Sequence, residues 1–395
     1  MSLIMRSFLT LTFLFLSITL SLAQEEAEDD KQVILISDMQ LQIEINQAMN
    51  DLYNFKFDKA EQQFRWLKQK YKWHPLPYFL LGLSEWWKIM PDMNNTSHDE
   101  KFLAYMDSVI LISENLYEKP KHKVEATFFL AAAYGFEGRL YSTEERGKWT
   151  KSAFVGKNAL NYMQEIEDDS DLSPELLFGK ALYNYFSVWV PENYPLLKPI
   201  IAFFPKGDKK LGIQQLTEVS YNAFYTRIEA MVFLMRILNS YENNKPRALQ
   251  IGEYLHTTYP DNPYFHRYYA RLLYSSGKFH AARPVAEDII KRIDDGMIGY
   301  EGTSGRYAAF FLGQIYESQK NNDKAKYYYL KAKTYSEEIK ATDTGYYHYS
   351  LLALGDIYKE EGNDRESKRY YKLVKKQAKR GDSVHKSARE KLRDF

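Results

Sequence analysis

Residues 306–332, RYAAFFLGQIYESQKNNDKAKYYYLKA, and residues 348–374, HYSLLALGDIYKEEGNDRESKRYYKLV, carry the pattern that decides the fold. In each stretch a glycine is followed by a tyrosine three positions later and by a second small residue twelve positions later. The glycines are Gly313 and Gly355, and the second small residues are Ala325 and Ser367. Small side chains let two helices approach closely, so the pattern predicts two helical hairpins.

This unit resembles the tetratricopeptide repeat, a helix-turn-helix motif of about 34 residues. In that motif the small residues receive the partner helix, and large aromatic side chains fill the seam to the next hairpin. Weaker copies of the offsets lie upstream, around Ala48, Ala60, Gly82, Ala131, Gly179, Ala248, Ala270 and Ala282. The resemblance implies an all-α fold, a right-handed superhelix (an α-α solenoid) of tetratricopeptide-like hairpins in residues 41–188 and 208–395, with a basic capping helix at the C-terminal end. An α/α toroid is the alternative fold, but it has no reason to keep the small-residue offsets.

The first residues have the pattern of a secretion signal. Arg6 precedes an apolar stretch over residues 8–20, and residues 21–23 (Ser-Leu-Ala) place small side chains where a signal peptidase cuts. We expect a signal peptide at residues 1–23, since the apolar run is shorter than the roughly 20 residues of a membrane span. An acidic tail and lead-in at residues 24–40 follows. The chain has no cysteine, which excludes a lipoprotein anchor, so the expected location is periplasmic or secreted.

Composition excludes some classes of function. The chain has 53 Lys and Arg against 52 Asp and Glu, and this balance does not point to a nucleic-acid partner. Its 33 Tyr, 23 Phe and 6 Trp suit both repeat interfaces and ligand grooves. The eight histidines have no metal-binding spacing, and no phosphate-binding glycine loop or nucleophile motif is present. We therefore expect a non-catalytic protein without a metal, a cofactor or an integral membrane anchor.

Residues 189–207 interrupt the helical pattern. They contain four prolines and four aromatic residues, and proline cannot donate the backbone hydrogen bond that a helix interior needs. The segment is expected to be a loop, either a lid over a groove or a plug in the superhelix. Residues 183–216 resemble a group of exported bacterial tetratricopeptide proteins that includes proteins associated with periplasmic transporters. That resemblance implies a location in the cell envelope.

The first helix of each tetratricopeptide hairpin lines a concave surface, and the positions that face it form the candidate binding site. In this chain they are mostly aromatic rings with interspersed arginines, which suits an extended peptide or a glycan. Alternatively, irregular hairpins close up and bury the rings as core. The residues selected as the binding surface are Trp86, Trp87, Phe136, Tyr183, Tyr264, Arg267, Arg271, Tyr274 and Tyr307.

Two functions stay open at this point. One is an exported tetratricopeptide scaffold that binds a protein or peptide partner in the cell envelope through the concave aromatic surface. The alternative is a small-ligand or glycan-binding component of an envelope uptake system. A scaffold tolerates a shallow open groove, whereas a ligand binder needs a closed pocket that holds several rings and a few polar groups.

Overall fold

The computed structural model describes residues 34–166, 173–202 and 204–395, and every regular element in these ranges is helical. The helices of the first half are η1 (Leu35–Ser37), α2 (Met39–Tyr53), α3 (Phe57–Lys70), α4 (Leu76–Ile89), α5 (Asp99–Tyr117), α6 (Lys123–Tyr141), α7 (Trp149–Glu165) and α8 (Pro174–Asn193). The second half contains η3 (Pro195–Leu197), α9 (Lys198–Ile201), α10 (Lys209–Asn222), α11 (Arg227–Ser240), α12 (Lys245–Thr258), α13 (Pro263–Ser275), α14 (Phe279–Asp294), α15 (Gly302–Ser318), α16 (Asn322–Glu338), α17 (Gly345–Glu360), α18 (Asp364–Gln377), α19 (Ser383–Lys391) and η4 (Leu392–Asp394). The predicted signal peptide at residues 1–23 and residues 24–33 of the predicted tail lie outside the described residues.

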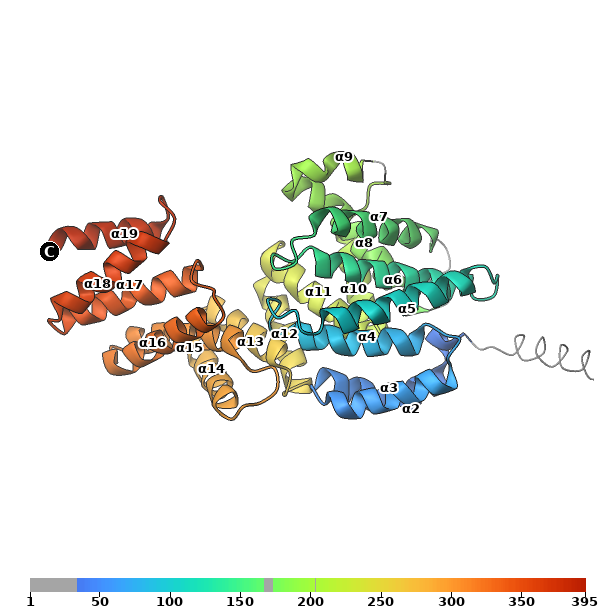
Figure 1. Cartoon of the computed structure of the whole chain (residues 1–395), viewed down its shortest axis with the longest axis horizontal. Coiled ribbons are helices and arrows are strands. Elements are labelled where there is room, and N and C mark those ends of the chain that lie inside the picture. The colour runs from blue at the N-terminus through green and yellow to red at the C-terminus, as the bar shows by residue number, and fades with distance from the viewer. Residues whose placement is uncertain (1–33, 167–172, 203) are drawn as a thin grey trace, which may run out of the picture.

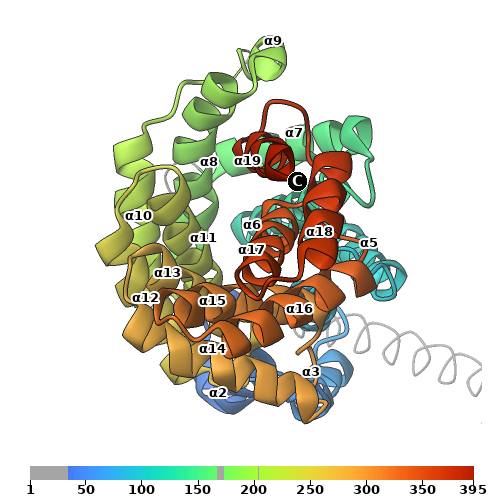
Figure 2. The same cartoon turned by 90° about the vertical axis from the view of Figure 1, so that its left-hand side faces the viewer.

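The long helices pack mainly on their neighbours along the chain, and the array curves as it proceeds (Figures 1 and 2). In Figure 1 the N-terminal helices form one thick body, and α14 to α19 extend from it as a thinner arm. Two clusters of buried apolar side chains follow the same division, one reaching from Leu35 to α13 and one centred on α14 to α19. The prediction of an all-α solenoid of helical hairpins is confirmed.

The two glycines that predicted the repeat lie where helices touch. A Cβ atom added to Gly313 would lie 2.6 Å from the ring of Tyr329 on α16, which is fully buried. Gly355 has the same relation to Tyr371 on α18, at still closer range. Only a residue without a side chain allows these rings to cross the seam, so the small-residue offsets set the spacing of both hairpins.

The proline-rich segment differs from the predicted loop over residues 189–207. Helix α8 continues to Asn193 with Pro191 in its last turn, where one missing backbone donor costs little because the helix ends there. The chain then forms η3 and α9, which lie at the edge of the molecule in both views (Figures 1 and 2). Tyr183 on α8 anchors the return of the chain by donating a hydrogen bond of 2.5 Å to the carbonyl of Pro205.

The first turn of the solenoid closes on itself. Trp87 on α4 donates from Nε1 to Glu229 on α11 at 2.9 Å, across 142 positions of sequence. Its ring also packs edge-on against Phe265 on α13, with centroids 5.1 Å apart. Nearby, Asn262 Nδ2 donates to the carbonyl of Tyr53 on α2 at 2.9 Å. These contacts hold α4 against α11 and α13, and they bring the loop after α4 close to α13.

We predict that Gly313→Ala lowers the free energy of unfolding by about 1–3 kcal/mol, because the new methyl group overlaps the buried Tyr329 ring. Gly135→Ala is the matched control, since it lies inside α6 and a Cβ there meets no atom within 4 Å. It should be neutral or stabilise by up to about 1 kcal/mol through helix propensity. Urea unfolding of both variants checks this, and equal stability of Gly313→Ala and the unmodified protein would contradict the assigned helix seam.

Candidate functional site

A cavity of about 490 Å³ lies where the loop after α4, the end of α6 and helices α11, α13 and α15 meet. Its wall holds five arginines and four tyrosines but a single carboxylate, that of Asp92. We call it the arginine pocket. The arginines come from four different helices and are Arg139, Arg236, Arg267, Arg271 and Arg306.

These five guanidinium groups lack the partners that buried arginines usually have. None of them lies within 4.0 Å of a carboxylate oxygen belonging to the described residues, although arginines elsewhere in the chain, such as Arg146 and Arg292, do form ion pairs. Burial, reinforced by the nearby Arg236, lowers the pKa of Arg139 to about 10. Burial likewise lowers the pKa of Arg267. Both groups stay charged at neutral pH, so the pocket concentrates positive charge that costs free energy to keep together.

Hydrogen bonds within the protein use only part of the donor capacity of the pocket. Arg267 donates from Nη1 to the carbonyl of Pro91 at 2.8 Å and to Ser304 Oγ at 3.0 Å. Three buried polar atoms of the wall have no hydrogen-bond partner in the described part of the chain, and these are Arg139 Nη1, Arg306 Nε and Thr303 Oγ1. Buried donors of this kind are rare in native proteins, and a bound acceptor such as an anion would satisfy them.

Aromatic rings hold the guanidinium groups in place. The guanidinium carbons of Arg267, Arg271 and Arg306 lie 5.6, 5.8 and 5.1 Å from the ring centroids of Tyr264, Tyr268 and Tyr307, respectively. Each tyrosine is close to its arginine in sequence, on the same helix. Stacking on a ring face orients the guanidinium without neutralising it, so the groups keep their charge for a ligand.

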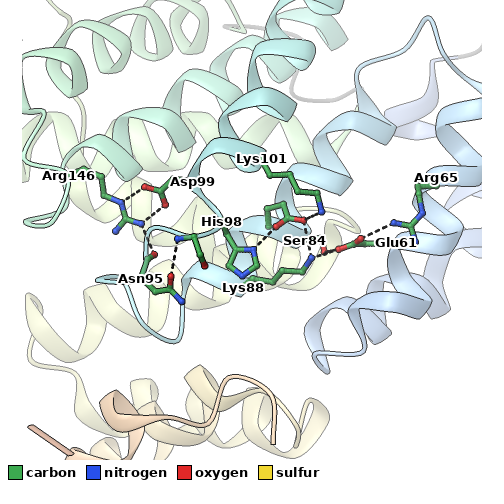
Figure 3. Close-up of polar contacts among 11 residues, drawn as sticks. Glu61, Arg65, Ser84, Lys88, Asn95, His98, Asp99, Lys101 and Arg146 are labelled. Atoms are coloured by element: carbon green, nitrogen blue, oxygen red, sulfur yellow. Dashed lines mark hydrogen bonds and ion pairs between the residues drawn. The ribbon is translucent and has the colours of Figure 1, made fainter. Parts of the chain in front are cut away.

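The loop that closes one side of the pocket is fixed by Arg146 (Figure 3). Arg146 binds both carboxylate oxygens of Asp99, at 2.8 and 2.5 Å, and donates to the carbonyls of Asn95, at 3.0 Å, and Met93. Residues 90–94 of this loop line the arginine pocket. The Arg146 contacts therefore set the position of one pocket wall before any ligand binds.

A polar network beside this loop joins α3, α4 and α5 (Figure 3). Glu85, which is 1% exposed, receives Lys88 at 3.0 Å, His98 Nδ1 at 2.8 Å and Lys101. Glu61 receives Lys88 at 2.5 Å and Ser84 at 2.8 Å. Burial alone would raise the pKa of Glu85, but the hydrogen bonds from Lys101 and Lys88 outweigh it and hold the pKa below its usual value. Every carboxylate here is paired inside the protein, so the network stabilises the helices.

A second cavity, of about 460 Å³, lies between α4, α6, α7, α8 and α11. Most of its wall is hydrocarbon, and we call it the apolar cavity. Six phenylalanines contribute to it: Phe79, Phe128, Phe136, Phe178, Phe186 and Phe233. Arg139 and Ser142 belong to the walls of both cavities. The arginine pocket and the apolar cavity are therefore neighbours that meet at the end of α6.

The structure separates the nine residues selected from the sequence into three groups. Tyr264, Arg267, Arg271 and Tyr307 line the arginine pocket, and Phe136 lines the apolar cavity. Trp86 and Trp87 are fully buried in the core, so the expectation that they are exposed on a concave surface does not describe them. Tyr183 holds the chain at Pro205, and Tyr274 stacks on Phe311 at 4.3 Å; neither lines one of the two cavities.

Sequence reasoning missed three arginines of the pocket, Arg139, Arg236 and Arg306. Arg139 and Arg236 are each the only arginine within an otherwise apolar stretch of α6 or α11. A charge in such a stretch is either buried or at a functional surface, since a solvated helix face would carry several. That signal was present in the sequence, but it does not show that the two residues meet.

Comparison with known proteins places the chain in no family, because no family model and no curated protein matches it. Solved structures do match. Among them, a monomeric mutant of IFIT1 with Gppp-AAAA is 14% identical with a TM-score of 0.33, and the match covers 90% of this chain and 76% of that one. The P58(IPK) TPR domain is 12% identical with a TM-score of 0.25, covering 91% and 98% of the two chains. A circular tandem repeat protein is 10% identical with a TM-score of 0.24, covering 89% and 94%.

Two searches of the described residues bear on other kinds of site. They contain no helix that is long and apolar enough to cross a membrane. They also contain no group of three or more His, Cys, Asp or Glu side chains placed to hold a metal ion.

We predict that Trp87→Ala lowers the free energy of unfolding by about 3–5 kcal/mol, because it leaves a cavity in the closed first turn and removes the donor to Glu229. Arg271→Gln should change stability by no more than about 0.5 kcal/mol, because Arg271 makes no hydrogen bond or ion pair with the described residues. Thermal melting of the two variants provides the comparison. A Trp87→Ala protein that melts with the unmodified protein would show that this ring is not core.

Proposed function

We propose that this chain is a non-catalytic binding protein that holds the anionic group of its ligand in the arginine pocket. The observation that carries the proposal is the set of five guanidinium groups without a carboxylate partner among the described residues. Placing like charges together raises the free energy of the unliganded protein, and an anion lowers it through charge-assisted hydrogen bonds. Such an arrangement suits phosphate or carboxylate, which guanidinium groups bind through two parallel N–H donors.

The shape of the site favours the small-ligand function over the scaffold for an extended peptide. A volume of about 490 Å³ falls in the range of small-molecule sites, and the wall combines rings with a few polar donors. A protein partner that inserts an acidic side chain or its terminal carboxylate is the competing candidate. It is favoured by a separate observation, the large exposed apolar side chains Trp149 and Phe154 on α7, which are 61% and 67% exposed.

We also propose that the protein works outside the cytoplasm, in the cell envelope. Support comes from the sequence pattern of residues 1–23, a charged start, an apolar stretch and small residues at the cleavage position. The mature protein should therefore begin at Gln24. N-terminal sequencing of the protein isolated from its native cells tests this, and recovery of an intact Met1 in the cytosolic fraction would refute it.

The pocket should bind a simple anion, and calorimetric titration with inorganic pyrophosphate tests this. We predict that Arg271→Gln weakens binding about tenfold or more, because a hydrogen bond to a charged group contributes about 1.5–3 kcal/mol. Lys372→Gln is the matched control, because it removes the same charge from an exposed position on α18 outside the pocket. It should leave binding unchanged.

Two results would contradict the proposal. Pyrophosphate binding that Arg271→Gln and Lys372→Gln weaken equally would reflect only the overall charge of the protein. Absence of binding to the unmodified protein at millimolar pyrophosphate would remove the anion site altogether.

A further inference from the structure

The boundary between the arginine pocket and the apolar cavity is the side chain of Arg139. Its guanidinium carbon lies 4.6 Å from the ring centroid of Trp86 and 5.1 Å from that of Phe233, which is part of the apolar wall. Its only hydrogen bond in the described residues is a long one of 3.6 Å from Nη2 to the sulfur of Met90. The side chain therefore presents a charged edge to one cavity and lies against the hydrocarbon of the other.

Two glycines give the apolar cavity its width. Gly135 on α6 and Gly156 on α7 both line it, and a Cβ added to either would meet no atom within 4 Å. Neither glycine has a positive φ, and neither lies at a helix seam. Glycine is a poor residue for a helix interior, so these positions have no local structural advantage. Their effect in the structure is to leave room between α6 and α7.

We propose that the ligand is an anionic lipid with one hydrocarbon chain, whose phosphate or carboxylate head occupies the arginine pocket and whose chain occupies the apolar cavity. This inference rests on the anion-binding function proposed above and names the class of ligand. A molecule that has both a charged end and an apolar end matches two adjoining cavities of opposite character. A peptide or a free sugar phosphate would leave the phenylalanine-lined cavity without a matching group.

One carboxyl group lies on the path of the chain, that of Glu229 in the apolar wall. Its Oε1 accepts from Trp87 Nε1 at 2.9 Å, and Oε2 has no partner in the described residues. Burial raises the pKa of Glu229, against the opposing influence of Arg139 and Trp87. A carboxyl group with a raised pKa repels an anionic head less than an ordinary one would.

Calorimetric titration with butyl, hexyl, octyl and decyl phosphate, each below its micelle concentration, tests the proposal. For the unmodified protein we expect affinity to rise about fourfold per added methylene until the cavity is full. Gly135→Leu should abolish this dependence on chain length and leave the affinity for inorganic pyrophosphate unchanged. Gly345→Leu is the matched control, because it adds the same side chain at the start of α17, where a Cβ also meets no atom, away from the cavity.

The outcomes separate this inference from the function on which it rests. Pyrophosphate binding together with alkyl phosphate affinities that do not depend on chain length would overturn the lipid and leave the anion site in place. Failure of both ligands to bind would overturn both. Equal affinity for octyl phosphate and uncharged octyl glucoside would also overturn the inference, as would an acidic peptide that displaces decyl phosphate and binds Gly135→Leu normally. Gly156→Leu repeats the test from α7 if Gly135→Leu fails to fold.

Discussion

The architecture depends on how closely two helices can approach. At Gly313 and Gly355 the absence of a side chain lets a tyrosine ring from the second helix lie against the first. Gly212 on α10 is tighter still, since a Cβ there would lie 2.8 Å from backbone atoms of α8. Close seams of this kind make each hairpin a thin rigid unit, and stacking such units produces the curved array on whose inner side both cavities lie.

The arginine pocket is an electrostatic consequence of closing that array. Helices α6, α11, α13 and α15 each supply at least one guanidinium group, and the Trp87–Glu229 contact holds α4 and its loop against them. No carboxylate within ion-pair distance in the described residues neutralises these groups. Hydrophobic packing of the surrounding core supplies the free energy that keeps them together, which is the usual way a binding site stores unfavourable charge. A ligand with negative charge then gains what the protein lacks.

Sequence reasoning reached the local features of this structure and missed the long-range ones. The hairpin seams at Gly313 and Gly355 follow from spacing, and helical periodicity alone places Arg267 and Arg271 on one face of α13. Trp87 was assigned to the same concave surface by the same periodicity, yet it is core, because α4 folds against α11 and α13. That contact joins positions 142 apart in sequence, and no repeat pattern encodes it. For the same reason the meeting of Arg139 with the α13 arginines could not be predicted.

The central claim is that the arginine pocket is a built anion site, and an experimental crystal structure grown with tungstate tests it most directly. The account predicts an anomalous peak inside the pocket, within hydrogen-bonding distance of the guanidinium groups of Arg267 and Arg271, with the polar atoms of Arg139, Thr303 and Arg306 turned toward it. The account would be contradicted by a structure in which tungstate binds elsewhere and the pocket arginines form ion pairs with carboxylates of the protein itself.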